Sequence, residues 1–187
     1  MKSLAAFALT VILASPALAQ HQTFTINPDA SEVRMTLNAT HEVVHGAFHV
    51  QSGLIEFDRG ASTMSGSIIV SATSGKTGND SRDKKMDKDV LKTEQYTTVL
   101  FTPRGYTGTI APSGDSTIQV MGVITLLGSP HNLTIPLQIH IAGEDCTAKA
   151  HFVIPYVQWG LKDPSFFIFR VEKQVDIDLS LTGRVSR

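Results

Sequence analysis

The segment from His41 to His45 (HEVVH) matches the HExxH pattern, in which two histidines bind zinc and the glutamate acts as a general base. This chemistry needs both histidines on adjacent turns of one helix. The residues from Val44 to Val50 instead alternate between apolar and polar, which predicts a β-strand. On a strand, His41 and His45 would stand about 13 Å apart, too far to share an ion whose bonds are about 2 Å long. A metal-dependent hydrolase is therefore a remote alternative.

Other patterns that carry chemistry are absent from the sequence. It contains no GxSxG nucleophile motif, no glycine-rich phosphate-binding loop and no cluster of cysteines and histidines. We therefore expect no enzyme, no catalytic residue, no resident cofactor and no dedicated metal site. His45 and His49 are expected on a polar strand face, where a metal shared with a histidine of another strand stays an open alternative. Those other histidines are His131, His140 and His151.

Most of the chain after Thr23 alternates between apolar and polar residues, as half-buried strands do. The clearest example runs from Leu133 to Ile141. The connections are short, which favours antiparallel pairing. We count eight to ten one-sided strands, and such strands need a shared interior, so the predicted fold is all-β. The alternation by itself leaves a closed barrel and a two-sheet sandwich open.

The stretch from Asp80 to Leu91 is the one convincing helix in the sequence. Its residues are mostly charged, and Met86, Val90 and Leu91 recur at a spacing that gives one narrow apolar stripe. The adjacent pair Arg82-Asp83 is interpreted as a capping or loop-fixing ion pair. We predict a short surface helix near 80–91 that interrupts the sheet. Two interpretations stay open, a plain crossover between strands and a lid over an opening.

Four large apolar residues follow one another from Phe166 to Phe169, directly after a loop that holds the only tryptophan, Trp159. Such a run does not alternate, so some of its side chains face away from the core of an ordinary one-sided strand. One interpretation is a strand buried on both sides or a plug at the end of a barrel. The other is an aromatic rim where an apolar ligand enters.

Cys146 is the only cysteine of the sequence, which excludes a disulfide within it. It shares its predicted strand face with Ala148, Ala150 and Phe152. We therefore predict a small buried side chain and not a reactive thiol.

The first 19 residues predict a signal peptide, and residues 20–187 a single exported domain. Lys2 gives a positive start, Leu4 to Leu13 an apolar run, and Ala17-Leu18-Ala19 a cleavage site. Losing Lys2 would leave 15 basic and 17 acidic residues, a balance that excludes a nucleic-acid partner. No later apolar run is long enough to cross a bilayer, so we expect no integral membrane segment. The expected location is the periplasm or the outside of the cell.

Five segments of the chain occur in an order that is typical of one family. Within the third segment, Ser74–Met86, a helix pattern N-x-x-R-D-x-x-(L/M) is filled by Asn79, Arg82, Asp83 and Met86. From Thr23 to Thr182 the chain thus resembles the YceI-like family of polyisoprenoid-binding proteins. The five segments are His45–Phe48 (HGAF), Gly53–Asp58 (GLIEFD), Ser74–Met86 (SGKTGNDSRDKKM), Thr98–Pro103 (TVLFTP) and Gly122–Gly128 (GVITLLG).

This resemblance implies an antiparallel, lipocalin-like β-barrel of about eight strands with one short helix. Its bore would be lined with apolar side chains and would hold an isoprenoid lipid, such as a polyprenol or a quinone tail. The candidate lining residues, chosen by strand face and family position, are Val44, Phe48, Met86, Leu91, Phe101, Ile135, Leu137, Phe152 and Phe167.

A second hypothesis comes from another class of protein. In it the bore is filled by the protein's own side chains, and the chain is a ligand-free β domain acting in envelope stress or in protein interaction. A homodimer also stays open. The discriminating feature is interior volume, which the sequence does not give.

Overall fold

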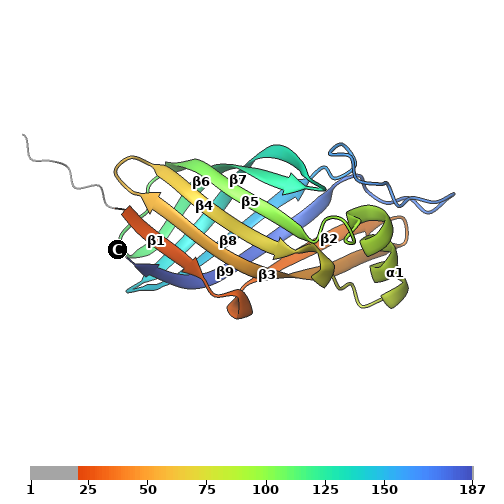
Figure 1. The fold of residues 1–187 in the computed structure, drawn as a ribbon, viewed down its shortest axis with the longest axis horizontal. Helices are drawn as coiled ribbons and strands as arrows, with labels where there is room; N and C mark the ends of the chain where they lie inside the picture. The colour runs from red at the N-terminus through yellow and green to blue at the C-terminus, as the bar shows by residue number, and fades with distance from the viewer. Residues whose placement is uncertain (1–20, 187) are drawn as a thin grey trace, which may run out of the picture.

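The computed structural model describes residues 21–186, and within them nine antiparallel strands form a single sheet (Figure 1). The predicted signal peptide lies outside the described residues. Successive strands along the chain pair with each other from β2 onward, and most connections are short, except those from β4 to β5 and from β8 to β9. The strands are β1 (His21–Ile26), β2 (Glu32–Ala39), β3 (Glu42–Asp58), β4 (Thr63–Ser71), β5 (Thr98–Gly108), β6 (Gly114–Leu126), β7 (Ser129–Ala142), β8 (Asp145–Ile154) and β9 (Val175–Ser186).

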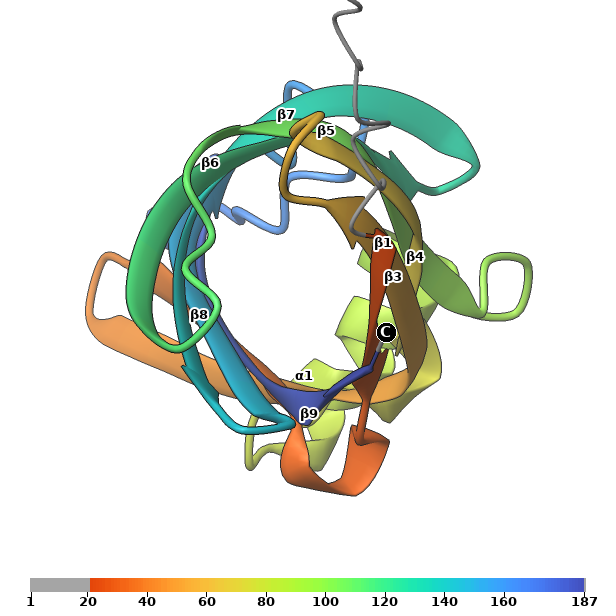
Figure 2. The same ribbon diagram turned by 90° about the vertical axis from the view of Figure 1, so that its left-hand side faces the viewer.

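The sheet closes into a barrel because β3 pairs with β4 as well as with β1 and β2. Figure 2 looks along this closed ring. Both β1 and β2 lie between β3 and β9, one after the other, so nine strands fill eight positions around the axis. The short 3-10 turn η1 (Pro28–Ala30) separates them. The antiparallel barrel expected from the resemblance is confirmed, and the sandwich is wrong.

Strand alternation puts one face of each strand inside the barrel. In β6, Ile118 and Val120 are buried, whereas Gln119 and Met121 between and beside them are exposed. The period of two along a strand produces this arrangement, since neighbouring side chains point to opposite faces. The interior is therefore apolar along its length, as the sequence pattern predicts.

The connection from β4 to β5 contains the predicted helix and lies beside the first part of β3. It comprises the 3-10 turn η2 (Ala72–Ser74), helix α1 (Asp80–Lys85) and the π-helical turn η3 (Met86–Leu91). Lys76 in this connection exchanges two backbone hydrogen bonds with Ala47, on an edge of β3 that β4 does not reach. The predicted helix thus exists over 80–91, with its second half wound as a π-helix.

The connection from β8 to β9, residues 155–174, lies at the same end as α1 and extends beyond the strands (Figure 1). Its run of Phe166, Phe167 and Ile168 is exposed by 65%, 78% and 86%. The interpretation of this run as a buried strand or plug is wrong, because Phe166 and Phe169 pair across a tight turn at the tip of the connection. The rest of the connection returns to the barrel where β9 begins.

The opposite end of the barrel carries the turn from β3 to β4. The buried carboxylate of Asp58 accepts hydrogen bonds from the backbone N–H groups of Gly60 and Ala61, at 2.7 and 2.9 Å. The buried hydroxyl of Tyr106 donates to the Asp58 carbonyl at 3.0 Å. These contacts fix the turn and tie β5 to it.

Asp58 gives this end a pH-dependent contribution to stability. The Ala61 N–H holds its pKa below the ordinary value, against the opposing effect of burial, and the Gly60 N–H and the charge of His21 add to the shift. A folded-state pKa below the unfolded value of about 3.9 stabilises the fold above that pH, and the contribution is lost as pH falls through the folded pKa.

We expect Asp58→Asn, which keeps an acceptor oxygen but does not ionise, to be less stable than wild type at pH 7. The difference should shrink as the pH falls below about 4. Urea unfolding midpoints from pH 7 to pH 2.5 measure it. A difference that stays constant over this range would show that the carboxylate charge has no role.

Candidate ligand-binding site

A cavity of about 710 Å³ runs inside the barrel, and side chains from all nine strands line it. This volume falls in the range of about 300–1,000 Å³ typical of small-molecule sites. An eight-position barrel is just wide enough for its own side chains or one slender ligand. Here the side chains leave space, so the bore is not filled by the protein itself.

Eight of the nine side chains proposed from the sequence line this cavity. Strand alternation brings most of them inside, and the apolar stripe of the 80–91 helix, which includes Val90, faces the same space. Both interpretations of the helix therefore describe it in part, since it is a crossover between strands whose apolar side faces the bore. The eight are Val44, Phe48, Met86, Leu91, Phe101, Ile135, Leu137 and Phe152.

Phe167, the ninth, does not line the cavity and is 78% exposed. Phe166 and Phe169 exchange two backbone hydrogen bonds of 2.9 Å, which makes Phe167 the first of two residues at a turn tip. The flanking Phe166 and Phe169 face the cavity instead. A tight turn has no alternating face, so the parity rule that places strand residues fails here.

The end of the cavity away from α1, which we call the inner end, is apolar. Ile110 and Phe57 are buried there, 4% and 5% exposed. Ile110 was missed by sequence reasoning, because it lies in a stretch rich in Gly, Thr, Ser and Pro. The predicted burial of Cys146 is confirmed, and burial raises the pKa of its thiol to about 11. A neutral thiol adds no charge to this part of the lining.

Polar lining groups gather at the other end, which we call the mouth. Apart from Cys146, they come from the start of β3, from the β4 to β5 connection, and from Tyr156 of the β8 to β9 connection. Burial raises the pKa of the Tyr156 hydroxyl to about 12, and this hydroxyl donates to the Glu172 carbonyl at 2.6 Å. The remaining polar groups at the mouth are Glu42, Thr77, Asn79, Ser81, Arg82 and Lys85.

Arg82 and Asp83 fix the loop at the mouth through a shared partner, Thr77. Arg82 donates from Nε to the Thr77 hydroxyl at 2.9 Å and from Nη2 to the Thr77 carbonyl at 3.1 Å. The buried Asp83 carboxylate accepts from the Thr77 hydroxyl at 2.6 Å and from its N–H at 2.9 Å. Both side chains therefore fix the loop, as the interpretation predicts, but they do not form an ion pair with each other. The charge partners, however, are Glu42 for Arg82 and Lys76 for Asp83.

The histidines of the HExxH segment do not meet. His41 lies in the turn before β3, and His45 lies in β3 opposite Thr36 of β2, with its exposed ring 3.2 Å from the Thr36 hydroxyl. The strand prediction for this segment is confirmed. Among residues 21–186, no three His, Cys, Asp or Glu side chains are grouped so that they could hold a metal ion.

A closed antiparallel barrel with an apolar bore and a polar mouth has the architecture of the lipocalin-like barrels. A model of the YceI-like domain matches the sequence over residues 24–183. The chain belongs to the YceI-like family, as the resemblance predicted. No curated protein sequence matches the chain significantly.

Solved structures share the fold at low sequence identity. A polyisoprenoid-binding domain from Saccharophagus degradans, implicated in plant cell wall breakdown, has a TM-score of 0.69 and 15% identity, covering 87% of this chain and 98% of that one. BcnA from Burkholderia cenocepacia has a TM-score of 0.66 and 17% identity, covering 87% and 99%. The Campylobacter jejuni YceI protein has a TM-score of 0.55 and 12% identity, covering both chains fully. Within residues 21–186, no helix has the length and apolar character needed to span a membrane.

Proposed function

We propose that this protein is an exported carrier that holds one isoprenoid chain, a polyprenol or a quinone tail, non-covalently in the barrel. The observation that carries the proposal is the lining of the cavity, which is apolar along the bore and polar only at the mouth. Such a surface suits a long hydrocarbon with one polar end. The polyisoprenoid-binding domain from Saccharophagus degradans, which has the same fold, supports this class of ligand.

Burial of the isoprenoid chain in the cavity supplies the binding affinity, and this needs no catalytic group. Shielding several hundred Å² of apolar surface at about 25 cal/mol per Å² gains on the order of 10 kcal/mol before the cost of ordering the ligand. We therefore assign binding, and no reaction, to the interior.

The arrangement of polar groups orients the ligand with its tail inward. The tail would reach the inner end near Ile110, where the lining is apolar. The head group would stay at the mouth, where Asn79, Ser81 and Lys85 offer hydrogen-bond donors to a hydroxyl, phosphate or quinone oxygen. Export through the predicted signal peptide, a periplasmic or secreted location, and a homodimer stay predictions.

The test is native mass spectrometry of the protein purified from its own host without detergent, followed by organic extraction. We expect an added mass that extracts as a polyprenyl lipid, since burial of this size gives slow release. A bare polypeptide mass that does not change after incubation with polyprenols and quinones would overturn the proposal. It would favour a role in protein interaction that does not use the cavity for an isoprenoid.

A further inference from the structure

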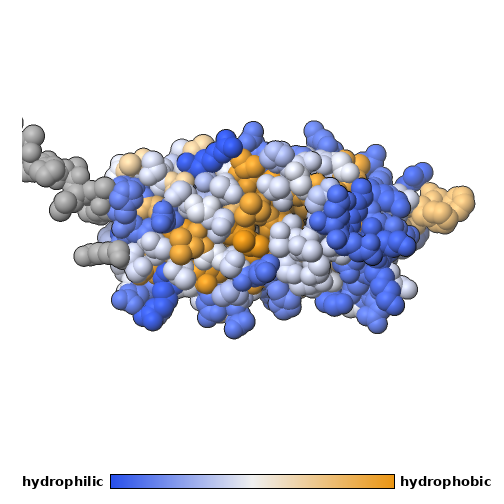
Figure 3. All heavy atoms as spheres, viewed as in Figure 1, coloured by the Kyte–Doolittle hydropathy of each residue, from blue (hydrophilic) through white to orange (hydrophobic). Residues whose placement is uncertain are grey.

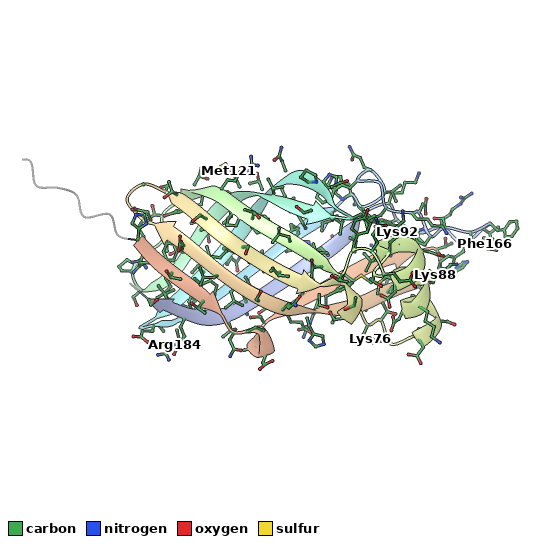
Figure 4. All side chains as sticks on the ribbon, in the orientation of Figure 1. Lys76, Lys88, Lys92, Met121, Phe166 and Arg184 are labelled. Atoms are coloured by element: carbon green, nitrogen blue, oxygen red, sulfur yellow. The ribbon has the colours of Figure 1, made fainter. Side chains whose placement is uncertain are left out.

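The tip of the β8 to β9 connection carries three large apolar side chains that are mostly exposed to solvent, two of them in edge-to-face contact with each other. Phe166, Phe167 and Ile168 are exposed by 65%, 78% and 86%. In Figure 3 the tip appears as an apolar projection beyond the hydrophilic surface around α1. Figure 4 labels Phe166 at this extremity, away from the barrel. Contiguous exposed apolar groups on a soluble domain mark a site of interaction.

The backbone conformation of the tip is a second feature that costs free energy in the folded protein. Phe167 has φ 47°, a left-handed conformation that is an outlier for a bulky side chain. Its position, first in a two-residue turn, favours glycine, which adopts positive φ without steric cost. A phenylalanine there is both strained and exposed, and strain of this kind concentrates at functional sites.

The tip is continuous with the mouth of the cavity. Phe166 and Phe169 flank the turn and line the cavity, together with Pro164 from the same connection. Lys162 forms an ion pair with Asp89 of η3 at 3.4 Å, which links the base of this connection to the helical segment across the mouth. A surface that contacts the tip therefore also faces the opening.

Positive charge gathers around the tip and the mouth. Residues 76–95 and 155–174 hold nine of the 16 basic residues of the sequence and seven of the 17 acidic ones, so the rest of the chain has a net charge of −3. We call residues 80–92, which comprise α1, η3 and the residue after them, the helical segment. Four of its lysines form no ion pair with any described residue: Lys84, Lys85, Lys88 and Lys92. Figure 4 shows Lys88 and Lys92 at the same end as Phe166.

The area of the tip separates two kinds of partner. An aromatic side chain offers about 150–250 Å², so Phe166 and Phe167 at their exposures give on the order of 300 Å², to which Ile168 adds less than one further ring. A stable protein interface buries about 800 Å² per partner. A projecting apolar tip flanked by lysines is too small for a second copy, but it suits insertion between the head groups of an anionic bilayer.

We propose that this tip docks the mouth of the barrel onto an anionic lipid bilayer, with Phe167 and Ile168 inserted and the lysines of the helical segment facing the head groups. An isoprenoid chain would then pass between membrane and cavity without crossing water. The docking itself goes beyond the carrier function. Only the passage of an isoprenoid chain between membrane and cavity rests on that proposed function.

The experiment is flotation of the purified protein with vesicles of phosphatidylethanolamine and phosphatidylglycerol, at two salt concentrations. We expect wild type to float, less so at high salt or without phosphatidylglycerol. The double variant Phe167→Ser, Ile168→Ser should bind at least tenfold more weakly. Met121→Ser is the matched control, because Met121 is an exposed apolar side chain on the barrel side, and it should bind like wild type.

Wild type that stays unbound, a tip variant that binds like wild type, or a Met121→Ser variant as weak as the tip variant would each overturn docking. So would a wild-type dimer in sedimentation that the tip variant converts to monomer, since the partner is then a second copy. Binding of a polyprenol added from ethanol is measured on the same variants. Flotation without polyprenol binding keeps docking and removes the carrier function; the reverse result removes docking alone.

Discussion

Leu137→Trp is expected to abolish isoprenoid retention while the barrel stays folded. Leu137 projects from β7 into the cavity, and an indole there would occupy the cross-section of a bore with room for one slender chain. A ligand that loses about 100 Å² of buried area loses about 2.5 kcal/mol, roughly 60-fold in affinity. The fold tolerates the larger side chain because the added volume enters open space, so the usual overpacking cost of about 1–3 kcal/mol should fall at its lower end.

Gln138→Trp is the matched control for this variant. Gln138 is the next residue of the same strand, but it faces outward and is exposed, so the same substitution leaves the bore unchanged. Lipid content after extraction and binding of an added polyprenol measure both variants, and circular dichroism checks the fold. Unchanged binding in Leu137→Trp would place the ligand somewhere other than the interior.

Ile118→Ala should have the largest effect on stability. Ile118 is 1% exposed on β6, which pairs on one side with β5 and on the other with β7. It does not line the open cavity, so truncation leaves a new void inside well-packed structure. Such substitutions cost about 2–5 kcal/mol. Urea unfolding should show a lower midpoint with an unchanged slope.

Met121→Ala on the same strand is the control for this measurement. Its side chain faces outward and is 42% exposed, so the free energy of unfolding should change by no more than about 0.5 kcal/mol. If Ile118→Ala cost less than the control, the inner end of the barrel would be loosely packed, contrary to the burial of Ile118.

Local patterns in the sequence predict the strands and the face that each presents to the interior. Leu137 and Gln138 are assigned to opposite faces by alternation alone, because successive side chains on a strand point to opposite sides. The same rule predicts the burial of Cys146 and excludes a helical zinc motif at His41. The spacing of the apolar residues predicts the stripe along the 80–91 helix, because apolar residues recur with different periods in helices and in strands.

Only the tertiary structure decides features that depend on which distant segments meet. Closure of the barrel depends on β3 pairing with β1, β2 and β4, and alternation is the same in a sandwich. The partners of Arg82 and Asp83 lie partly on another strand, at Glu42. The mouth of the cavity exists only once the start of β3 and two long connections meet at one end. Phe167 turns outward because a hydrogen-bonded turn, and not strand alternation, sets its direction. The physical reason is common to all of these: a local pattern records which side of a segment is buried, whereas pairing over long sequence distances sets what that side encloses.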